Sequence, residues 1–183
     1  MNSLKEKCIS SKLIYNGKVI NLYSDEALLP NGRTAVREYI THNGAVCVVP
    51  ITEANEIIMV RQYRYPFAQV TLEIPAGKLE KGEDIYICAQ RELSEETGAS
   101  AGDLKYIGEY YPSPAILNEV LYMFTAKHLT YKSMHTDEDE FIQTEKIPFD
   151  KLVKMILNGE IKDGKTQAAV LKAYLLEQNT LLK

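Results

Sequence analysis

Glu92, Glu95 and Glu96 lie close together in the segment RELSEETG, residues 91–98. On a helix they fall within about 100° of one another and border the apolar ridge that ends in Leu93. Like charges at this spacing cost about 0.2 to 0.5 kcal/mol each, so helix stability does not explain them. Carboxylates one turn apart can share a divalent cation, because Mg²⁺ prefers hard oxygen ligands. A solvated acidic face is the alternative for any glutamate-rich helix.

The residues around these glutamates follow a fixed spacing. The run GKLEKGEDIYICAQRELSEETGA has the order G, five residues, E, seven residues, then R-E-aliphatic-x-E-E-x-G-aliphatic. It resembles the signature of the Nudix hydrolases, which bind Mg²⁺ or Mn²⁺ and hydrolyse nucleoside diphosphates linked to another group. The departure is Ala99, where a bulkier aliphatic residue is usual, and this bears on packing and not on metal binding.

The resemblance implies a metal site with about two to three Mg²⁺ or Mn²⁺ ions. It assigns as ligands four glutamates and one carbonyl oxygen: Glu92, Glu95, Glu96, Glu140 and Ala76. Glu95 also counts as catalytic, since it binds a second ion or orients water. Gly77 is expected to turn the chain sharply after LEIPA, so that the carbonyl group of Ala76 faces a metal ion.

Arg91 and the acidic loop TDEDEF are expected to supply further catalytic residues. Arg91 can reach Glu83 or Glu95 and hold a carboxylate in place, although an ordinary surface pair with Glu95 is the alternative. In the resembled enzymes a glutamate of such a loop is the general base. This assigns the base to Glu138 and metal binding to Glu140, with the two roles open to exchange. A solvated loop is the ordinary interpretation of such an acidic run.

The segments on either side of this signature reduce the number of possible substrates. LEIPAGK, together with Pro114 sixteen residues after Gly98, resembles the ADP-ribose pyrophosphatase branch of the family. The implied reaction converts ADP-ribose to AMP and ribose 5-phosphate. Within this resemblance, substrate binding is assigned to four residues: Arg37, Arg64, Ser113 and Glu119. The alternatives are that Pro114 only ends a strand and that the charged residues are ordinary surface groups.

Two other functions stay open. The substrate can be another nucleoside diphosphate sugar, such as GDP-mannose, because the sequence does not place the pocket residues that would choose between them. The protein can also be a nucleotide-binding regulator on the same fold without turnover. Such modules typically lose signature glutamates, whereas this chain keeps all of them.

The order of elements predicts an α/β fold. Asn-Gly pairs at 16–17, 31–32 and 43–44 predict two-residue hairpin turns between antiparallel N-terminal strands. A helical pattern over 83–97 ends at Gly98, more strands follow, and two helical patterns close the chain. We therefore expect a mixed sheet covered by helices, and the resemblance implies the Nudix fold, an α/β/α sandwich.

The resemblance also predicts the organisation of the chain. It divides the chain into an N-terminal strand segment, residues 1–45, and a catalytic domain, residues 46–183. Relatives in this branch form homodimers that exchange the N-terminal strands, so Arg37 is placed to act in the partner's site.

Composition excludes several classes of protein. The chain has 183 residues with a net charge of -4, which argues against nucleic acid as the main partner. Its three cysteines show no CxxC spacing, so neither a disulfide framework nor a zinc site is indicated and a reduced, cytoplasmic chain is expected. The longest apolar run, AVCVVPI, is too short to span a membrane, and the N-terminus lacks a signal peptide's apolar region.

Overall fold

The computed structural model describes residues 4–132 and 141–178. The chain forms two compact units. Unit 1 comprises residues 1–43 and 111–119, and unit 2 comprises residues 44–110 and 120–183. The segment 111–119 therefore belongs with the N-terminal strands, although the chain around it belongs to unit 2.

Unit 1 is a three-stranded antiparallel sheet in the order β1-β2-β3. Its strands are β1 (Lys7–Asn16), β2 (Asn21–Leu28) and β3 (Thr34–Thr41). Every residue of β1 is exposed, and Ala27 is the one buried hydrophobic residue in the described part of unit 1. Near the end of β3, Ile40 forms a parallel bridge with Leu117 of the segment 111–119. The expected antiparallel N-terminal strands are confirmed.

The Asn-Gly pairs at 16–17 and 31–32 lie at the ends of hairpins, as expected, but the two-residue length expected for their turns is wrong. Residues 17–20 separate β1 from β2, with the Gly17 amide donating to the Ile20 carbonyl at 2.9 Å. Residues 29–33 form a longer loop between β2 and β3. The pair at 43–44 makes no hairpin, because the next strand pairs with partners in unit 2. An Asn-Gly pair marks a turn without fixing the length of the loop.

The described part of unit 2 contains two sheets and three α-helices. Its strands are β4 (Ala45–Pro50), β5 (Glu56–Arg64), β6 (Gln69–Glu73), β7 (Ala76–Lys78), β8 (Ala99–Tyr110), β9 (Leu121–Tyr131) and β10 (Gln143–Pro148). Its helices are the 3-10 turn η1 (Tyr65–Phe67), α1 (Ile85–Thr97), α2 (Phe149–Leu157) and α3 (Gly164–Glu177). One sheet has the order β10-β5-β6, and the other has the order β7-β4-β9-β8. The second sheet is mixed, because β4 and β9 are parallel while its other pairs are antiparallel.

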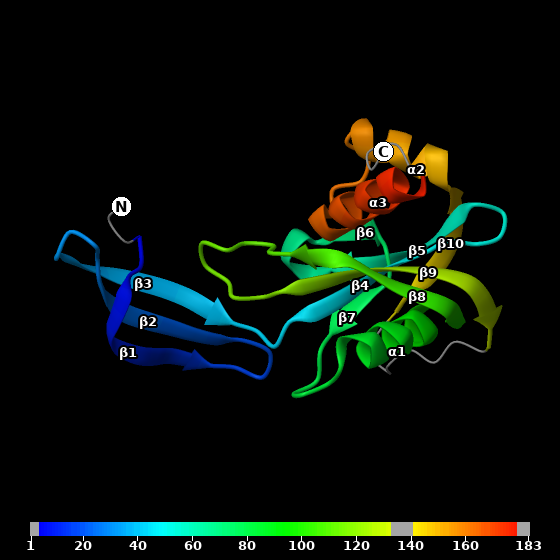
Figure 1. Ribbon diagram of the computed structural model, residues 1–183. Coiled ribbons are helices and arrows are strands. Elements are labelled where there is room, and N and C mark those ends of the chain that lie inside the picture. Colours follow the sequence, from blue (N-terminus) through cyan, green and yellow to red (C-terminus); the bar gives the residue numbers. More distant parts are fainter. Residues whose placement is uncertain (1–3, 133–140, 179–183) are drawn as a thin grey trace. The chain divides into compact units, whose positions relative to one another are not determined.

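Helices cover both faces of the sheets in unit 2, with α1 on one side and α2 and α3 on the other (Figure 1). The residues of β4 alternate between the two sides: Val46 and Val48 join the core cluster that contains Leu93 of α1, whereas Cys47 and Val49 join the cluster with α2 and α3. A strand buried on both faces is apolar throughout, as AVCVVP is. This layering confirms the expected α/β/α sandwich with a mixed sheet.

Local signals fix the ends of α1. The side chain of Asp84 accepts hydrogen bonds from the amides of Tyr86 and Ile87 at 2.8 and 3.2 Å, and so caps the N-terminus. Gly98 ends the helix with a φ of 68°. The helix begins at Ile85, slightly later than expected, because Asp84 takes the capping position. Among the described helices, none is long and apolar enough to cross a membrane.

Candidate active site

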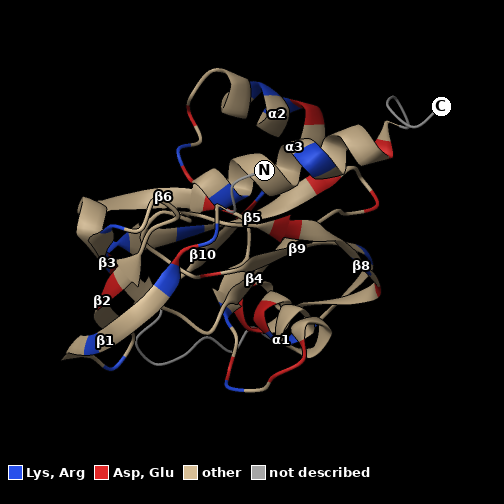
Figure 2. Cartoon of the chain, turned by 60° about the vertical axis from the view of Figure 1, so that its left-hand side comes forward, with Lys and Arg blue, Asp and Glu red and all other residues tan. Residues whose placement is uncertain are grey.

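α1 turns two of its three clustered glutamates toward the interior of unit 2. Glu92 is 9% exposed and Glu96 is 3% exposed, and between them Leu93 is fully buried. The side chain of Glu95, by contrast, is 40% exposed. Two carboxylates with so little access to water need hydrogen-bond donors or cations. Acidic residues mark both α1 and the loop that leads into it (Figure 2).

Glu96 is held against the short strand β7. Its Oε2 atom accepts a hydrogen bond from the Ala76 amide at 3.0 Å. β7 is fixed in turn by β4, since Ala76 pairs with Cys47 and the carbonyl of Pro75 accepts from the Val48 amide at 2.9 Å. The structure therefore brings a buried carboxylate and the backbone of the expected carbonyl ligand together.

Gly77 lies at a close approach between β7 and the side chain of Glu92. A Cβ atom at this position would lie 1.9 Å from the Cδ atom of Glu92. Gly77 is absent from the glycines with positive φ, so the expected reason for it, a sharp turn, is wrong. The missing side chain instead leaves the space that the Glu92 carboxylate occupies.

Arg91 holds three carboxylates around its guanidinium group. Nε donates to Glu83 at 2.9 Å, and Nη1 donates to Glu92 and Glu95 at 2.8 and 3.0 Å. The hydrogen bond from Arg91 is the main cause that lowers the pKa of Glu83 to about 2. The same contact raises the pKa of Arg91 above its ordinary value. Arg91 thus reaches both of the partners expected for it.

The donor atoms at this place fit a hard divalent cation. Carboxylate oxygens of Glu92 and Glu96 and the carbonyl oxygen of Ala76 are the ligand types that Mg²⁺ prefers. Among the residues that the structure describes, no group of three or more His, Cys, Asp or Glu side chains is gathered to hold a metal ion. Arg91 lies against Glu92 and the more exposed Glu95 in this arrangement.

Arg64 is bound to a buried carboxylate. Its Nε and Nη2 atoms donate to Glu73 at 2.8 and 2.6 Å, and Thr71 and Lys165 also donate to Glu73. Burial alone would raise the pKa of Glu73, which is 2% exposed, but the hydrogen bonds and charges of Arg64 and Lys165 outweigh it and lower the pKa to about 2. The side chain of Arg64 stays 38% exposed, so its outer side remains accessible to a ligand.

Sequence reasoning missed this buried cluster. Lys165 and Glu73 are 92 residues apart, and only Glu73 lies in a quoted segment, LEIPAGK, which was used for the resemblance and not for a buried ion pair. The one available signal was the acidic residue of LEIPAGK inside an otherwise apolar stretch, because a buried carboxylate requires a cationic partner.

The three other residues expected to bind substrate lie in unit 1. Arg37 donates to exposed Glu6 at 2.9 and 2.7 Å. The Oε1 atom of Glu119 lies 3.3 Å from Nδ1 of His42, a contact that the sequence did not indicate. The carbonyl group of Ser113 accepts a hydrogen bond from the Leu117 amide at 2.9 Å.

The expected general base lies outside the described residues. Glu138 and Glu140 both belong to segment 133–140. Their roles stay predictions.

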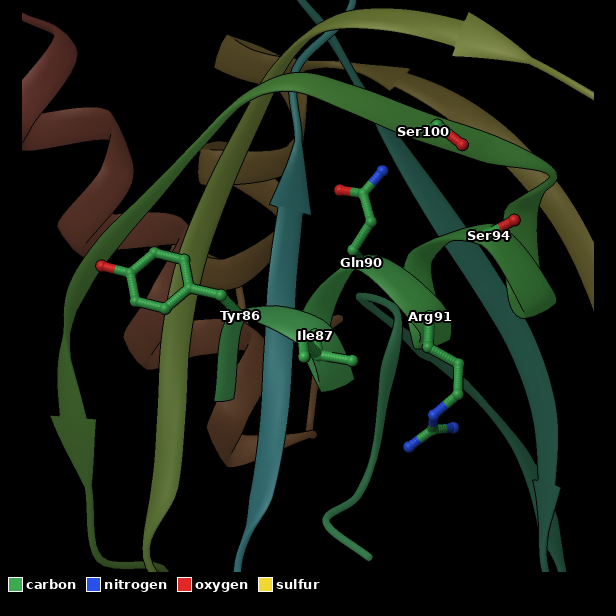
Figure 3. Close-up of a pocket in the computed structure, with 6 residues that line it drawn as sticks. All are labelled: Tyr86, Ile87, Gln90, Arg91, Ser94 and Ser100. Carbon is green, nitrogen blue, oxygen red and sulfur yellow. The ribbon is translucent and has the colours of Figure 1, made fainter. Parts of the chain in front are cut away.

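A hollow of about 500 Å³ lies along the outer face of α1 (Figure 3). It is lined by Tyr86, Ile87, Gln90, Arg91, Ser94 and Ser100. Gln90 extends toward Ser100, whereas the guanidinium group of Arg91 points to the opposite side. None of the three clustered glutamates lines this hollow, but Arg91 does, and it donates hydrogen bonds to Glu92 and Glu95.

A comparison with protein families decides the class of the protein. The family model described as NUDIX domain matches residues 41–170. The chain belongs to the Nudix hydrolase family. The signature segment and the whole of α1 lie inside the matched region.

Relatives of this Nudix hydrolase span almost its full length. An ADP-ribose pyrophosphatase of Bacillus subtilis (strain 168) is 41% identical over 179 residues, 97% of each chain. A methanol dehydrogenase activator of Bacillus methanolicus is also 41% identical, over 97% of this chain and 96% of its own. A GDP-mannose pyrophosphatase of Enterobacter sp. (strain 638) is 30% identical over 94% of this chain and 96% of its own.

A solved structure confirms the Nudix fold. A crystal structure described as ADP compounds hydrolase superposes with a TM-score of 0.87 and covers 99% of this chain and 100% of its own. The two sequences are 22% identical, so this likeness concerns the fold alone.

Proposed function

We propose that this Nudix hydrolase cleaves the pyrophosphate bond of ADP-ribose and releases AMP and ribose 5-phosphate. The observation that carries the proposal is the pair of nearly buried carboxylates, Glu92 and Glu96, beside the backbone of Ala76. A relative that is 41% identical over 97% of both chains is an ADP-ribose pyrophosphatase, which favours this substrate.

The proposed metal ligands are Glu92, Glu96, Glu95, Glu140 and the carbonyl oxygen of Ala76. About two to three Mg²⁺ or Mn²⁺ ions bound there would lower the pKa of water and neutralise charge on the phosphates. Arg91 keeps Glu83, Glu92 and Glu95 in one arrangement, which reduces the reorganisation needed for binding.

The proposed reaction is hydrolysis at one phosphorus of the pyrophosphate. Glu138 takes a proton from the attacking water, a new P–O bond forms to the water oxygen, and the bond to the bridging oxygen breaks. Each product then carries one phosphate group. If Glu140 is the base, Glu138 is the metal ligand, and the same bonds form and break.

Four residues are proposed to bind the nucleoside diphosphate sugar: Arg37, Arg64, Ser113 and Glu119. Arginine suits this task because its guanidinium group can contact two phosphate oxygens at once. For Arg64, the proposal is supported by the bidentate contact with Glu73, which fixes the guanidinium group while its outer side stays accessible.

We also propose that the protein is a homodimer in which unit 1 packs against a second copy. The support lies in β1, where Ile9, Leu13, Ile14 and Tyr15 are each between 45% and 57% exposed. A small sheet with so little buried surface is unstable alone in water, and a partner that covers it would stabilise it.

Two alternative functions have a specific observation in their favour. The GDP-mannose pyrophosphatase relative favours a different nucleotide sugar. The relative named as an activator of methanol dehydrogenase, at the same 41% identity as the ADP-ribose pyrophosphatase, favours a regulator.

A substrate panel tests the proposal. The purified protein with Mg²⁺ is incubated with ADP-ribose, GDP-mannose or UDP-glucose, and the nucleotide products are separated by chromatography. We expect ADP-ribose to be cleaved fastest. AMP and ribose 5-phosphate should form in equal amounts, and only when metal is present. Faster release of GMP from GDP-mannose would favour the first alternative. No release from any substrate would favour the regulator.

A further inference from the structure

The segment from Glu73 to Ala76 is fixed at every residue. The Glu73 side chain is bound by Arg64 and Lys165, and the Ile74 amide donates to Oγ1 of Thr166 at 3.0 Å. The next two residues are held through the Pro75 carbonyl and the Ala76 amide, as described above. Two of these anchors, Lys165 and Thr166, come from the first turn of α3.

The hydroxyl group of Thr166 has a defined orientation. It donates to Oδ2 of Asp163 at 2.5 Å, and the Thr166 amide donates to the same oxygen at 2.9 Å. Because its one hydrogen is directed to Asp163, the hydroxyl oxygen presents a lone pair to the Ile74 amide. Thr166 is fully buried, so water does not replace this acceptor in the folded protein.

Helix capping does not require this hydroxyl group. Asp163 already accepts from the Thr166 amide, which caps α3 without any contribution from Oγ1. The hydrogen bond to Ile74 instead joins α3 to a segment 92 residues away. Ile74 lies two residues before Ala76, so a shift of its amide would move the Ala76 carbonyl group.

We infer that Thr166 is a positioning residue that, through the Ile74 amide, sets the direction of the Ala76 carbonyl group toward the metal ions. This inference rests on the proposed function, since it assigns Ala76 as a ligand. Groups that orient a metal ligand change metal affinity or activity by about ten- to a hundredfold when they are removed.

The test compares Thr166→Val, which removes the hydroxyl group, with Thr166→Ser, which keeps it. The matched control is Thr52→Val, because Oγ1 of Thr52 also accepts from a backbone amide, that of Glu56 at 3.1 Å, in the turn between β4 and β5. Mn²⁺ binding to the substrate-free protein is measured by calorimetry, and exchange of the Ile74 amide hydrogen by NMR. Values of kcat and KM for ADP-ribose are measured in parallel.

We expect T166V to bind Mn²⁺ about tenfold more weakly and to lose about tenfold in kcat, with an unchanged KM and faster Ile74 exchange. T166S and T52V should match the wild type in metal affinity and kcat. If T166V does not fold, Thr166→Ala replaces it, with the same expected losses.

The outcomes separate two failures. Wild-type metal affinity in a folded T166V or T166A variant would overturn the role of Thr166. Equal losses in T166S and in the valine variant would also overturn it, because the hydroxyl group would then not be responsible. A wild-type protein that neither binds Mn²⁺ nor hydrolyses ADP-ribose would instead overturn the proposed function.

Discussion

Replacing Glu92 or Glu96 by glutamine exchanges one carboxylate oxygen for an amide nitrogen and leaves the other oxygen in place. Glutamine at either position still offers an oxygen to Arg91 or to the Ala76 amide. What glutamine lacks is the negative charge that a divalent ion requires. A single substitution at either position therefore separates the contribution of the side chain to the fold from its proposed role in metal binding.

Glu92→Gln and Glu96→Gln should each lower kcat by at least about a hundredfold while leaving the circular dichroism spectrum unchanged. Steady-state kinetics with ADP-ribose at several Mg²⁺ concentrations measures the loss. Glu177→Gln is the control, because Glu177 forms an exposed pair with Lys127 on the surface. Near-normal turnover in both site variants would contradict the assignment of Glu92 and Glu96 as metal ligands.

Glu73 makes the stability of the folded protein depend on pH. Its pKa in the fold, about 2, lies below its ordinary value of 4.5. The ionised carboxylate therefore contributes its full stabilisation above about pH 4.5, and this contribution is lost as the pH falls toward 2. One pKa unit corresponds to about 1.4 kcal/mol, so the contribution is roughly 3 kcal/mol.

Glu73→Gln should lower the free energy of unfolding by roughly 3 kcal/mol at neutral pH, because Arg64 and Lys165 lose their counter-charge. The difference from the wild type should shrink at pH values below 4.5. Urea unfolding followed by circular dichroism, at several pH values from neutral to acid, measures it. A difference that stays constant over this range would refute the assigned charge state of Glu73.

At the scale of elements, the site depends on three short pieces: α1, β7 and the first turn of α3. α1 was predictable because its apolar period, its Asp84 cap and Gly98 all agree. β7 was not, because a strand of three residues shows no alternation and exists only through its pairing with β4. The role of α3 depends on contacts between residues 92 positions apart, which no local pattern encodes.

The approach of β7 to α1 gives a prediction for Gly77→Ala. The added methyl group would occupy the place of the Glu92 carboxylate, which sits at the end of a flexible side chain and can move away. We expect the free energy of unfolding to change by less than about 1 kcal/mol. The activity should fall by at least about tenfold, because the displaced carboxylate no longer faces the proposed metal site.

Thermal unfolding and ADP-ribose hydrolysis, measured on the same preparation of G77A, separate the two effects. Gly102→Ala is a control on the β8–β9 pair, where the nearest atoms to an added Cβ are the Cβ and the carbonyl oxygen of His128, both at 3.1 Å. Full activity in G77A would show that Glu92 does not need the space that Gly77 leaves.

At the scale of the whole molecule, the two units differ in how they bury apolar residues. The described residues of unit 2 form two clusters of buried side chains, one on each face of its sheets. In the described part of unit 1, Ala27 alone is a buried hydrophobic residue. The sequence predicted the N-terminal strands from their β-forming residues. It did not predict that segment 111–119 belongs with them, because this depends on the bridge between Ile40 and Leu117.

If a second copy covers β1, a charge placed on that strand should prevent association. Leu13→Asp and Ile14→Asp introduce a carboxylate at side chains that are 45% and 50% exposed in one chain. Burying an unpaired carboxylate in an interface costs several kcal/mol, so each variant should be monomeric where the wild type is dimeric. Lys12→Ser is the control, since it adds no charge that an interface would have to bury.

Light scattering after size-exclusion chromatography measures the mass. A wild type that elutes with the mass of one chain would refute the dimer, and its activity would then show that one chain forms the complete site.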